Sequence, residues 1–111
     1  MADERAARLA TNEARFREIN ERVERDLGPL IDTQDELLPF VCECGRPRCT
    51  ATIGLSVAEY ESVRRDATRF VVVPGHEIED VEDVVGRADR YVVVRKHPDT
   101  WEIVEQLDPR R

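Results

Sequence analysis

Aromatic residues, lysine and long apolar runs are all scarce in this chain of 111 residues. Aromatic residues make up 5% of it, and all but one of its 17 basic residues are arginine, the exception being Lys96. No apolar run approaches the roughly 20 residues that a helix needs to cross a membrane. The segment Met1-Ala-Asp-Glu-Arg5 also lacks the apolar core of a signal peptide. We therefore expect a cytoplasmic protein without a membrane partner.

The chain also has no excess of positive charge with which to bind a phosphate backbone. Its net charge is -7 at pH 7, because 24 acidic residues outnumber 17 basic ones. We therefore do not expect nucleic acid as a partner, although a local basic patch is compatible with this charge. Charged residues make up 37% of the chain and hydrophobic residues 41%, which predicts one small domain with a thin core.

The three cysteines of the chain lie close together, in the segment Phe40-Val-Cys-Glu-Cys-Gly-Arg-Pro-Arg-Cys-Thr50. In a reducing compartment, an odd number of clustered thiols is more typical of a metal site than of a disulfide framework. The pattern Cys-x-Cys-x4-Cys, with a glycine and a proline bending the chain between the thiols, suits tetrahedral zinc. The predicted zinc ligands are Cys42, Cys44 and Cys49. A redox-active or sensing thiol site, and inert thiols, remain alternatives.

A tetrahedral zinc site takes a fourth ligand, and the chain has two histidines, His76 and His97. We predict His76, because Pro74-Gly75 makes a tight turn before it and Glu77 can accept a hydrogen bond from its imidazole. One expectation conflicts with this choice. A strand-helix-strand crossover over residues 55–73 would carry His76 to the far end of the sheet from the cysteines. His97, water, a carboxylate and a partner's residue remain alternatives.

The apolar pattern predicts an α+β fold. We expect an amphipathic N-terminal helix, a small mainly antiparallel sheet with the zinc knuckle at a hairpin tip, and one or two further short helices. Within a single domain overall, residues 1–28 form the N-terminal helix and residues 37–111 the zinc-stabilised α+β domain. Strands are predicted at 37–41, 50–55 and 70–73 and in a hairpin over 84–94, whose first arm could instead be a short helix. Further helices are predicted at about 56–66, where Ser56-Val-Ala-Glu59 forms a capping box, and at 98–107.

The N-terminal helix carries a narrow apolar stripe. Leu9, Phe16 and Val23 recur every seven residues, and Ile19 lies between the last two. The stripe either docks on the protein's own sheet or pairs with another chain, in which case Asn12 would set the register of a coiled coil. We favour docking within the chain, and therefore a monomer over a homodimer formed through this helix.

Four motifs together resemble a known family. They are Asn12-Glu13-x2-Phe16-Arg17-x2-Asn20, Phe40-Val-Cys-Glu-Cys44 followed by Cys49, Leu55-x3-Glu59-Tyr60, and Val73-Pro-Gly-His-Glu77. Over nearly the whole chain they resemble a family of small uncharacterised bacterial proteins, chiefly from actinobacteria. The resemblance implies a metal site on the three cysteines and His76, and it implies no activity.

The sequence contains no motif that indicates catalysis. We find no HExxH-type zinc motif, no phosphate-binding glycine loop and no Ser/His/Asp set. Three thiolates would also acidify a zinc-bound water poorly. We therefore expect a non-enzymatic zinc protein that acts as a protein-interaction or regulatory module, with another protein as its partner. A thiol- or zinc-based redox or metal sensor is the alternative, and a nucleic-acid-associated protein is the weaker one.

The clearest basic cluster in the sequence is expected to be solvated surface rather than a binding site. It comprises Arg46, Arg48, Arg64, Arg65 and Arg69. Four acidic residues lie among these five arginines between positions 42 and 70, so the segment has a net charge of only +1 (5 − 4).

Overall fold

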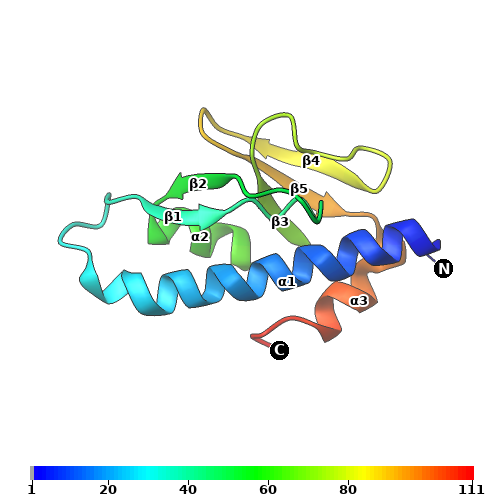
Figure 1. Ribbon diagram of the computed structural model, residues 1–111, viewed down its shortest axis with the longest axis horizontal. Coiled ribbons are helices and arrows are strands. Elements are labelled where there is room, and N and C mark those ends of the chain that lie inside the picture. The colour runs from blue at the N-terminus through cyan, green and yellow to red at the C-terminus, as the bar shows by residue number, and fades with distance from the viewer. Residues whose placement is uncertain (1) are drawn as a thin grey trace.

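The computed structural model describes residues 2–111, so that Met1 of the predicted unit 1–28 lies outside the described residues. The fold is α+β, as predicted (Figure 1). Its elements are α1 (Glu4–Leu27), β1 (Leu38–Val41), β2 (Thr52–Leu55), α2 (Val57–Arg64), β3 (Arg69–Val72), β4 (Glu82–Arg87), β5 (Val92–Lys96) and α3 (Trp101–Gln106), with short 3₁₀ turns at Gly28–Leu30 and Pro98–Thr100. None of the helices within residues 2–111 combines the length and the apolar character that crossing a membrane requires.

The strands form two small antiparallel sheets rather than the single sheet predicted. β1 pairs with β2, and β3, β5 and β4 form a second sheet in that order. Side chains alternate between the two faces of a strand, and in β1 and β2 the residues directed into the core are Leu38, Phe40, Ile53 and Leu55. Phe40 stacks on Tyr60 of α2, with ring centroids 4.4 Å apart. The hairpin and α2 thus share one core.

Helix α2 begins at the motif that predicts it. Ser56 is the N-cap, its hydroxyl accepts a hydrogen bond from the Glu59 N–H, and the Glu59 carboxylate accepts one from the Ser56 N–H. This reciprocal pair satisfies two amide donors that a helix start leaves without partners. The predicted capping box is confirmed.

Helix α1 runs the length of the molecule, with the β1–β2 hairpin over its C-terminal half and the three-stranded sheet over its N-terminal half (Figure 1). Asp3 caps it by accepting a hydrogen bond from the Ala6 N–H at 2.7 Å. The small side chains Ala6, Ala10 and Ala14 are buried and let the helix approach its neighbours closely. The prediction that α1 docks on its own chain is confirmed.

The face that α1 buries is not the predicted stripe. Its fully buried large side chains are Glu13 and Arg17, with Asn20 beside them, whereas Ile19 of the stripe is 40% exposed. Val23 does pack against the core from a partly buried position. Periodicity misassigned the face because it weighs side chains by polarity, and these polar side chains have partners inside the fold.

Arg17 shows how a charged side chain is accommodated there. Its guanidinium donates to the carbonyl oxygens of Ala67, at 2.7 Å, and of Arg69. It also lies over the Phe70 ring, 3.7 Å from the centroid. Burial lowers the pKa of Arg17, and the nearby carboxylate of Glu43 opposes that shift. Both neighbouring carbonyls and the aromatic face therefore stabilise the buried charge.

A second buried charge cluster joins α1 to the three-stranded sheet. Lys96 Nζ lies 2.7 Å from Glu13 Oε1 and 3.2 Å from Glu82 Oε1, and all three side chains are almost completely buried. Burial raises the pKa of Glu13 well above its usual value, and Lys96 only partly opposes this. Glu82 lies in the acidic segment 77–83, whose composition is typical of solvated surface, but its carboxylate is buried beside the Lys96 ammonium group.

Candidate metal centre

The cysteines lie in the loop between β1 and β2, as predicted. The Cys42 N–H donates to the Ala51 carbonyl at 2.9 Å and extends the hairpin, and the Cys49 N–H donates to the Arg46 carbonyl at 3.0 Å and closes a turn. Gly45 has a φ of +79°, and a Cβ there would lie 2.9 Å from the Leu9 carbonyl oxygen. Only glycine suits both this conformation and this close approach to α1.

His76 reaches the same place from the end of β3. Its N–H donates to the Val73 carbonyl at 2.8 Å, across the predicted Pro74-Gly75 turn. The Val73 N–H in turn donates to Cys42 Sγ at 3.2 Å, so that the end of β3 lies beside the cysteine loop. The expected conflict does not arise, because β2 and β3 belong to different sheets.

The four predicted ligands converge on one point. The Sγ atoms of Cys42, Cys44 and Cys49 and a ring nitrogen of His76 lie within 4.8 Å of one another. His76 Nδ1 is 3.6 Å from Sγ of both Cys42 and Cys49. Tetrahedral zinc, with Zn–S of about 2.3 Å and Zn–N of about 2.0–2.1 Å, separates a sulfur from a nitrogen ligand by about 3.6 Å. The group is thus of a size that can hold a metal ion.

Burial and protonation in this cluster also suit a cation. Cys42 and Cys44 are 1% and 0% exposed, whereas Cys49 and His76 are half-buried. A hydrogen bond between the two buried cysteines raises the pKa of Cys42, helped by burial, and lowers the pKa of Cys44. A metal ion bound here would displace the thiol protons, since cysteine binds metals as the thiolate.

Two buried polar residues that sequence reasoning missed as site residues hold the loop in place. The Asn20 amide of α1 donates to the Val41 carbonyl at 2.9 Å and to Glu43 Oε2 at 2.8 Å, and its oxygen accepts from the Val41 N–H at 2.7 Å. Glu43 Oε1 accepts from the Val71 N–H at 3.0 Å. Glu43, which lies between two of the cysteines, thus links the loop to α1 and β3.

The carboxyl group of Glu43 lies in a wholly enclosed position. Burial raises its pKa, while Arg17 and the hydrogen bonds from Asn20 and Val71 oppose the shift. In the sequence, the position of Glu43 between Cys42 and Cys44 was the one indication that it belongs to the site. A solvated carboxylate there would have been the ordinary expectation for a surface loop.

Asn12 makes a hydrogen bond to the cysteine loop of its own chain. Its Nδ2 donates to the Gly45 carbonyl oxygen at 3.0 Å and so ties α1 directly to the cysteine loop. The sequence suggested that Asn12 would set the register of a coiled coil if the helix paired with another chain. In this structure the amide instead helps to position the candidate ligands.

The side chains of His97 and Glu77 contact partners other than the candidate metal ligands. His97 Nε2 lies 3.2 Å from Asp83 Oδ1, and His97 is not in the group that can hold a metal. Glu77 Oε1 accepts a hydrogen bond from the Gly75 N–H at 2.8 Å and so stabilises the turn itself. The expected hydrogen bond from the imidazole to Glu77 is thus replaced by one from the backbone.

The two histidines offer a direct test of the fourth ligand. We expect His76→Ala to weaken zinc binding by about a hundredfold or more, since even outer hydrogen-bond partners of a ligand are worth about 10- to 100-fold. The matched control, His97→Ala, should leave the affinity unchanged. Competition with a chromophoric chelator measures both affinities. The opposite order would exclude His76 as a ligand.

The predicted basic cluster is dispersed. Arg64 is buried, and its guanidinium pairs with Asp108 and, at 3.3 Å, with Glu21. Arg46 and Arg48 remain exposed on the cysteine loop. The five arginines therefore do not form one surface, which agrees with the expectation that they make no joint binding site.

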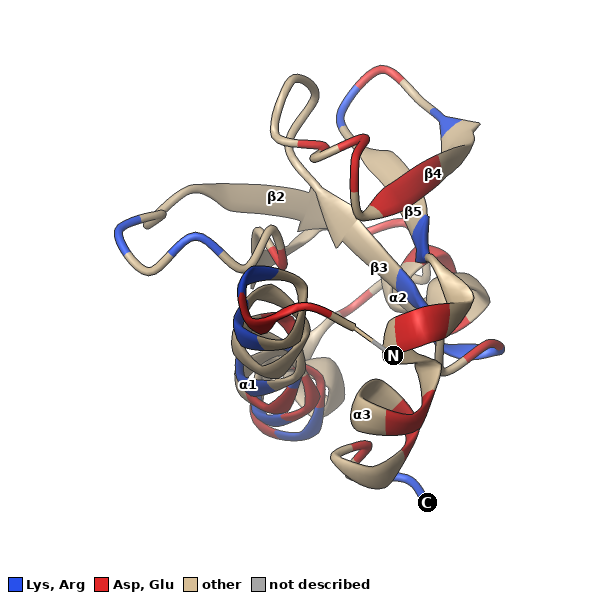
Figure 2. Ribbon diagram, turned by 90° about the vertical axis from the view of Figure 1, so that its right-hand side faces the viewer, with Lys and Arg blue, Asp and Glu red and all other residues tan. Residues whose placement is uncertain are grey.

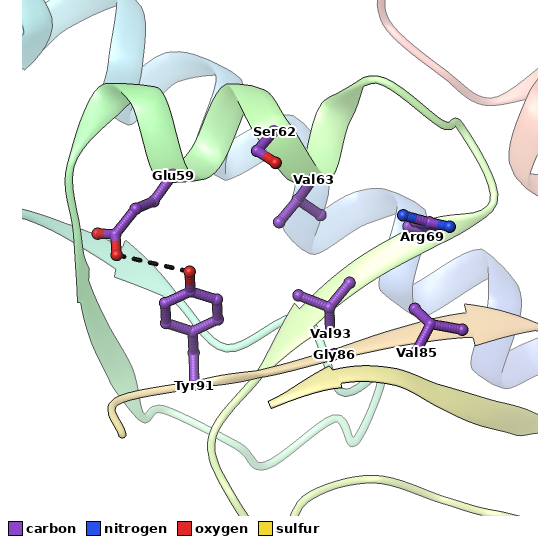
Figure 3. Close-up of a pocket in the computed structure, with 8 residues that line it drawn as sticks. All are labelled: Glu59, Ser62, Val63, Arg69, Val85, Gly86, Tyr91 and Val93. Atoms are coloured by element: carbon purple, nitrogen blue, oxygen red, sulfur yellow. Dashed lines mark hydrogen bonds between the residues drawn. The ribbon is translucent and has the colours of Figure 1, made fainter. Parts of the chain in front are cut away.

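A cavity of about 110 Å³ lies between α2 and the three-stranded sheet (Figure 3), and no cysteine lines it. The titratable groups at its wall include Glu59, Arg69 and Tyr91. Glu59 is already engaged, because it caps α2 and accepts hydrogen bonds from Arg90 at 2.8 Å and from the Tyr91 hydroxyl at 3.5 Å. The cavity therefore gives no support to a catalytic function, and the expectation of a non-enzyme stays a prediction.

Comparison of the chain with protein-family models, with curated proteins and with solved structures found no match. The resemblance to the bacterial family therefore stays a prediction.

Proposed function

We propose that this is a non-catalytic zinc protein in which Cys42, Cys44, Cys49 and His76 hold one zinc ion, mainly for structure. The observation that carries the proposal is the convergence of the four donor atoms within 4.8 Å, with sulfur-to-nitrogen distances of 3.6 Å. Three thiolates and an imidazole are a typical ligand set for structural zinc, and four protein ligands leave no position for a reactive water.

The structural role follows from where the ligands lie in the chain. Three come from the β1–β2 loop and the fourth from the turn after β3, and these strands belong to separate sheets. A zinc ion would therefore cross-link the two sheets. A domain of this size gains much of its stability from such a link, because its apolar core is small.

A closed site without catalytic surroundings fits a module whose surface binds another protein. We propose that it acts as a monomer in the cytoplasm, since α1 buries its polar face within its own chain. Sensing is the competing function. It is disfavoured because two of the three thiols, Cys42 and Cys44, are almost completely shielded from solvent.

Zinc content and its response to oxidant test this proposal. We expect about one zinc per chain in the purified protein, and slow release by dilute peroxide, because buried coordinated thiolates oxidise slowly. A zinc-sensitive dye measures release, with full release in guanidinium chloride as the control. Rapid release that a reductant reverses would make the site a sensor and overturn the structural role.

A further inference from the structure

Four exposed arginines lie on the cysteine loop and on α1, to which the loop is bonded. Arg46 and Arg48 flank Pro47 at the tip of the cysteine loop, and Arg8 and Arg15 lie on the outer side of α1. We refer to these four residues as the arginine face. None of the four is buried, in contrast to Arg17 of the same helix.

The two halves of the arginine face are adjacent. The Asn12 side chain of α1 donates a hydrogen bond to the Gly45 carbonyl, and Arg46 is the next residue of the loop. Arg8 and Arg15 lie four residues before and three residues after Asn12, which places all three on one side of α1. Figure 2 shows basic segments of α1, among acidic ones, and basic segments of the loop before β2 on the same side of the molecule.

The residues of the arginine face make few ion pairs within the chain. Among residues 2–111, Arg15, Arg46 and Arg48 make no ion pair, and Arg8 makes only a 4.0 Å contact with Glu4 in which both side chains are largely exposed. Arg64 and Arg110, by contrast, each pair with two or more carboxylates. Free guanidinium groups that gather on one side of a chain with a net charge of -7 are available to a partner.

A shallow groove and an exposed apolar side chain lie beside the arginine face. A shallow groove of about 360 Å³ on α1 is lined by Glu4, Ala7, Arg8, Thr11, Asn12 and Arg15. Ile19, which is 40% exposed, follows Arg15 by one helical turn. A bound segment could therefore pair carboxylates with the arginines and cover an apolar side chain at the same time.

We propose that the arginine face binds an acidic segment of a partner protein that also carries apolar residues. Arginine presents a planar set of donors that matches a carboxylate, so several such groups recognise an acidic peptide well. Nucleic acid fits less well, because the side chain exposed beside the arginines is the aliphatic Ile19 rather than an aromatic residue on which bases could stack. The inference rests on the proposed function in one respect, which is that zinc orders the loop that carries Arg46 and Arg48.

The test uses full-length, zinc-loaded protein and a fluorescein-labelled, glutamate-rich peptide interspersed with leucines. We expect salt-sensitive binding, and we expect Arg46→Glu/Arg48→Glu to weaken it by roughly tenfold or more, through lost attraction and new repulsion. Arg15→Glu should weaken it as well. The control, Arg111→Glu, makes the same charge change as Arg15→Glu, on an exposed arginine at the C-terminus, and should alter binding less than about twofold. Fluorescence anisotropy measures each dissociation constant.

Three results would overturn the proposal. They are no binding of the peptide, equal binding by the loop variant and the Arg111→Glu control, and tighter binding of a labelled oligothymidylate than of the peptide. Zinc content, measured on every variant, separates this proposal from the proposed function. Loss of the arginine dependence with zinc retained refutes this inference alone, whereas zinc-free wild type that still binds through the arginines refutes the proposed function alone.

Discussion

Cys44→Ser is expected to release the metal and to abolish cooperative unfolding. Cys44 is 0% exposed and its Sγ lies within the group of four converging donors. A serine hydroxyl is a poor ligand for zinc, so that only three donors would remain to hold the ion. Apparent zinc-binding energies of about 10–16 kcal/mol in small zinc domains rival the whole stability of a domain, about 5–15 kcal/mol.

The measurement combines metal analysis with thermal unfolding. Wild-type protein should lose its transition when a strong chelator removes the metal, and should regain it when zinc, but not magnesium, is added back. His97→Ala serves as the matched control, because His97 lies outside the donor group and contacts Asp83 instead. A metal-free Cys44→Ser protein with an unchanged melting curve would refute a structural metal.

Asn20→Ala is expected to cost about 3–5 kcal/mol of folding free energy, because it leaves one buried and two partly buried groups without this partner. These groups are the N–H and the carbonyl of Val41 and the carboxylate of Glu43. Glu43 keeps its hydrogen bond from the Val71 N–H, but its charge is then less well satisfied in a fully buried position. The loss should therefore exceed that of an ordinary hydrogen bond.

The same helix supplies the control for that experiment. Asn12→Ala removes a single hydrogen bond, to the Gly45 carbonyl, at a half-buried position and should cost only about 1 kcal/mol. Urea unfolding of zinc-loaded protein measures both free energies, and equal m-values would show that the comparison is sound. Equal, small losses for Asn12→Ala and Asn20→Ala would mean that the bonds around Glu43 do not position the loop.

Features that depend on neighbours within a few residues could be predicted from the sequence. The capping box of α2, the hairpin that carries the cysteines and the turn before His76 all formed as expected. The preferred candidate ligands were also those that the structure brings together. Local rules work here because turns, caps and short Cys spacings are set by backbone geometry and by adjacent side chains.

These local rules could not predict which face of α1 is buried. Glu13, Arg17 and Asn20 read as solvent-exposed in a periodicity analysis, yet their partners are Lys96, the Ala67 and Arg69 carbonyls, and the β1–β2 loop. Each partner is distant in sequence. A polar side chain can be buried only if such a partner is present, and the amino-acid pattern of the helix contains no record of it.

By itself the sequence determined that three thiols would cluster, because their spacing leaves the chain little choice, and that a histidine after a Pro-Gly turn was available to them. Only the tertiary structure decided between His76 and His97. That decision depends on β2 and β3 joining different sheets, which brings the end of β3 against Cys42. Sheet pairing is a long-range contact, decided by how the whole core packs rather than by any short segment.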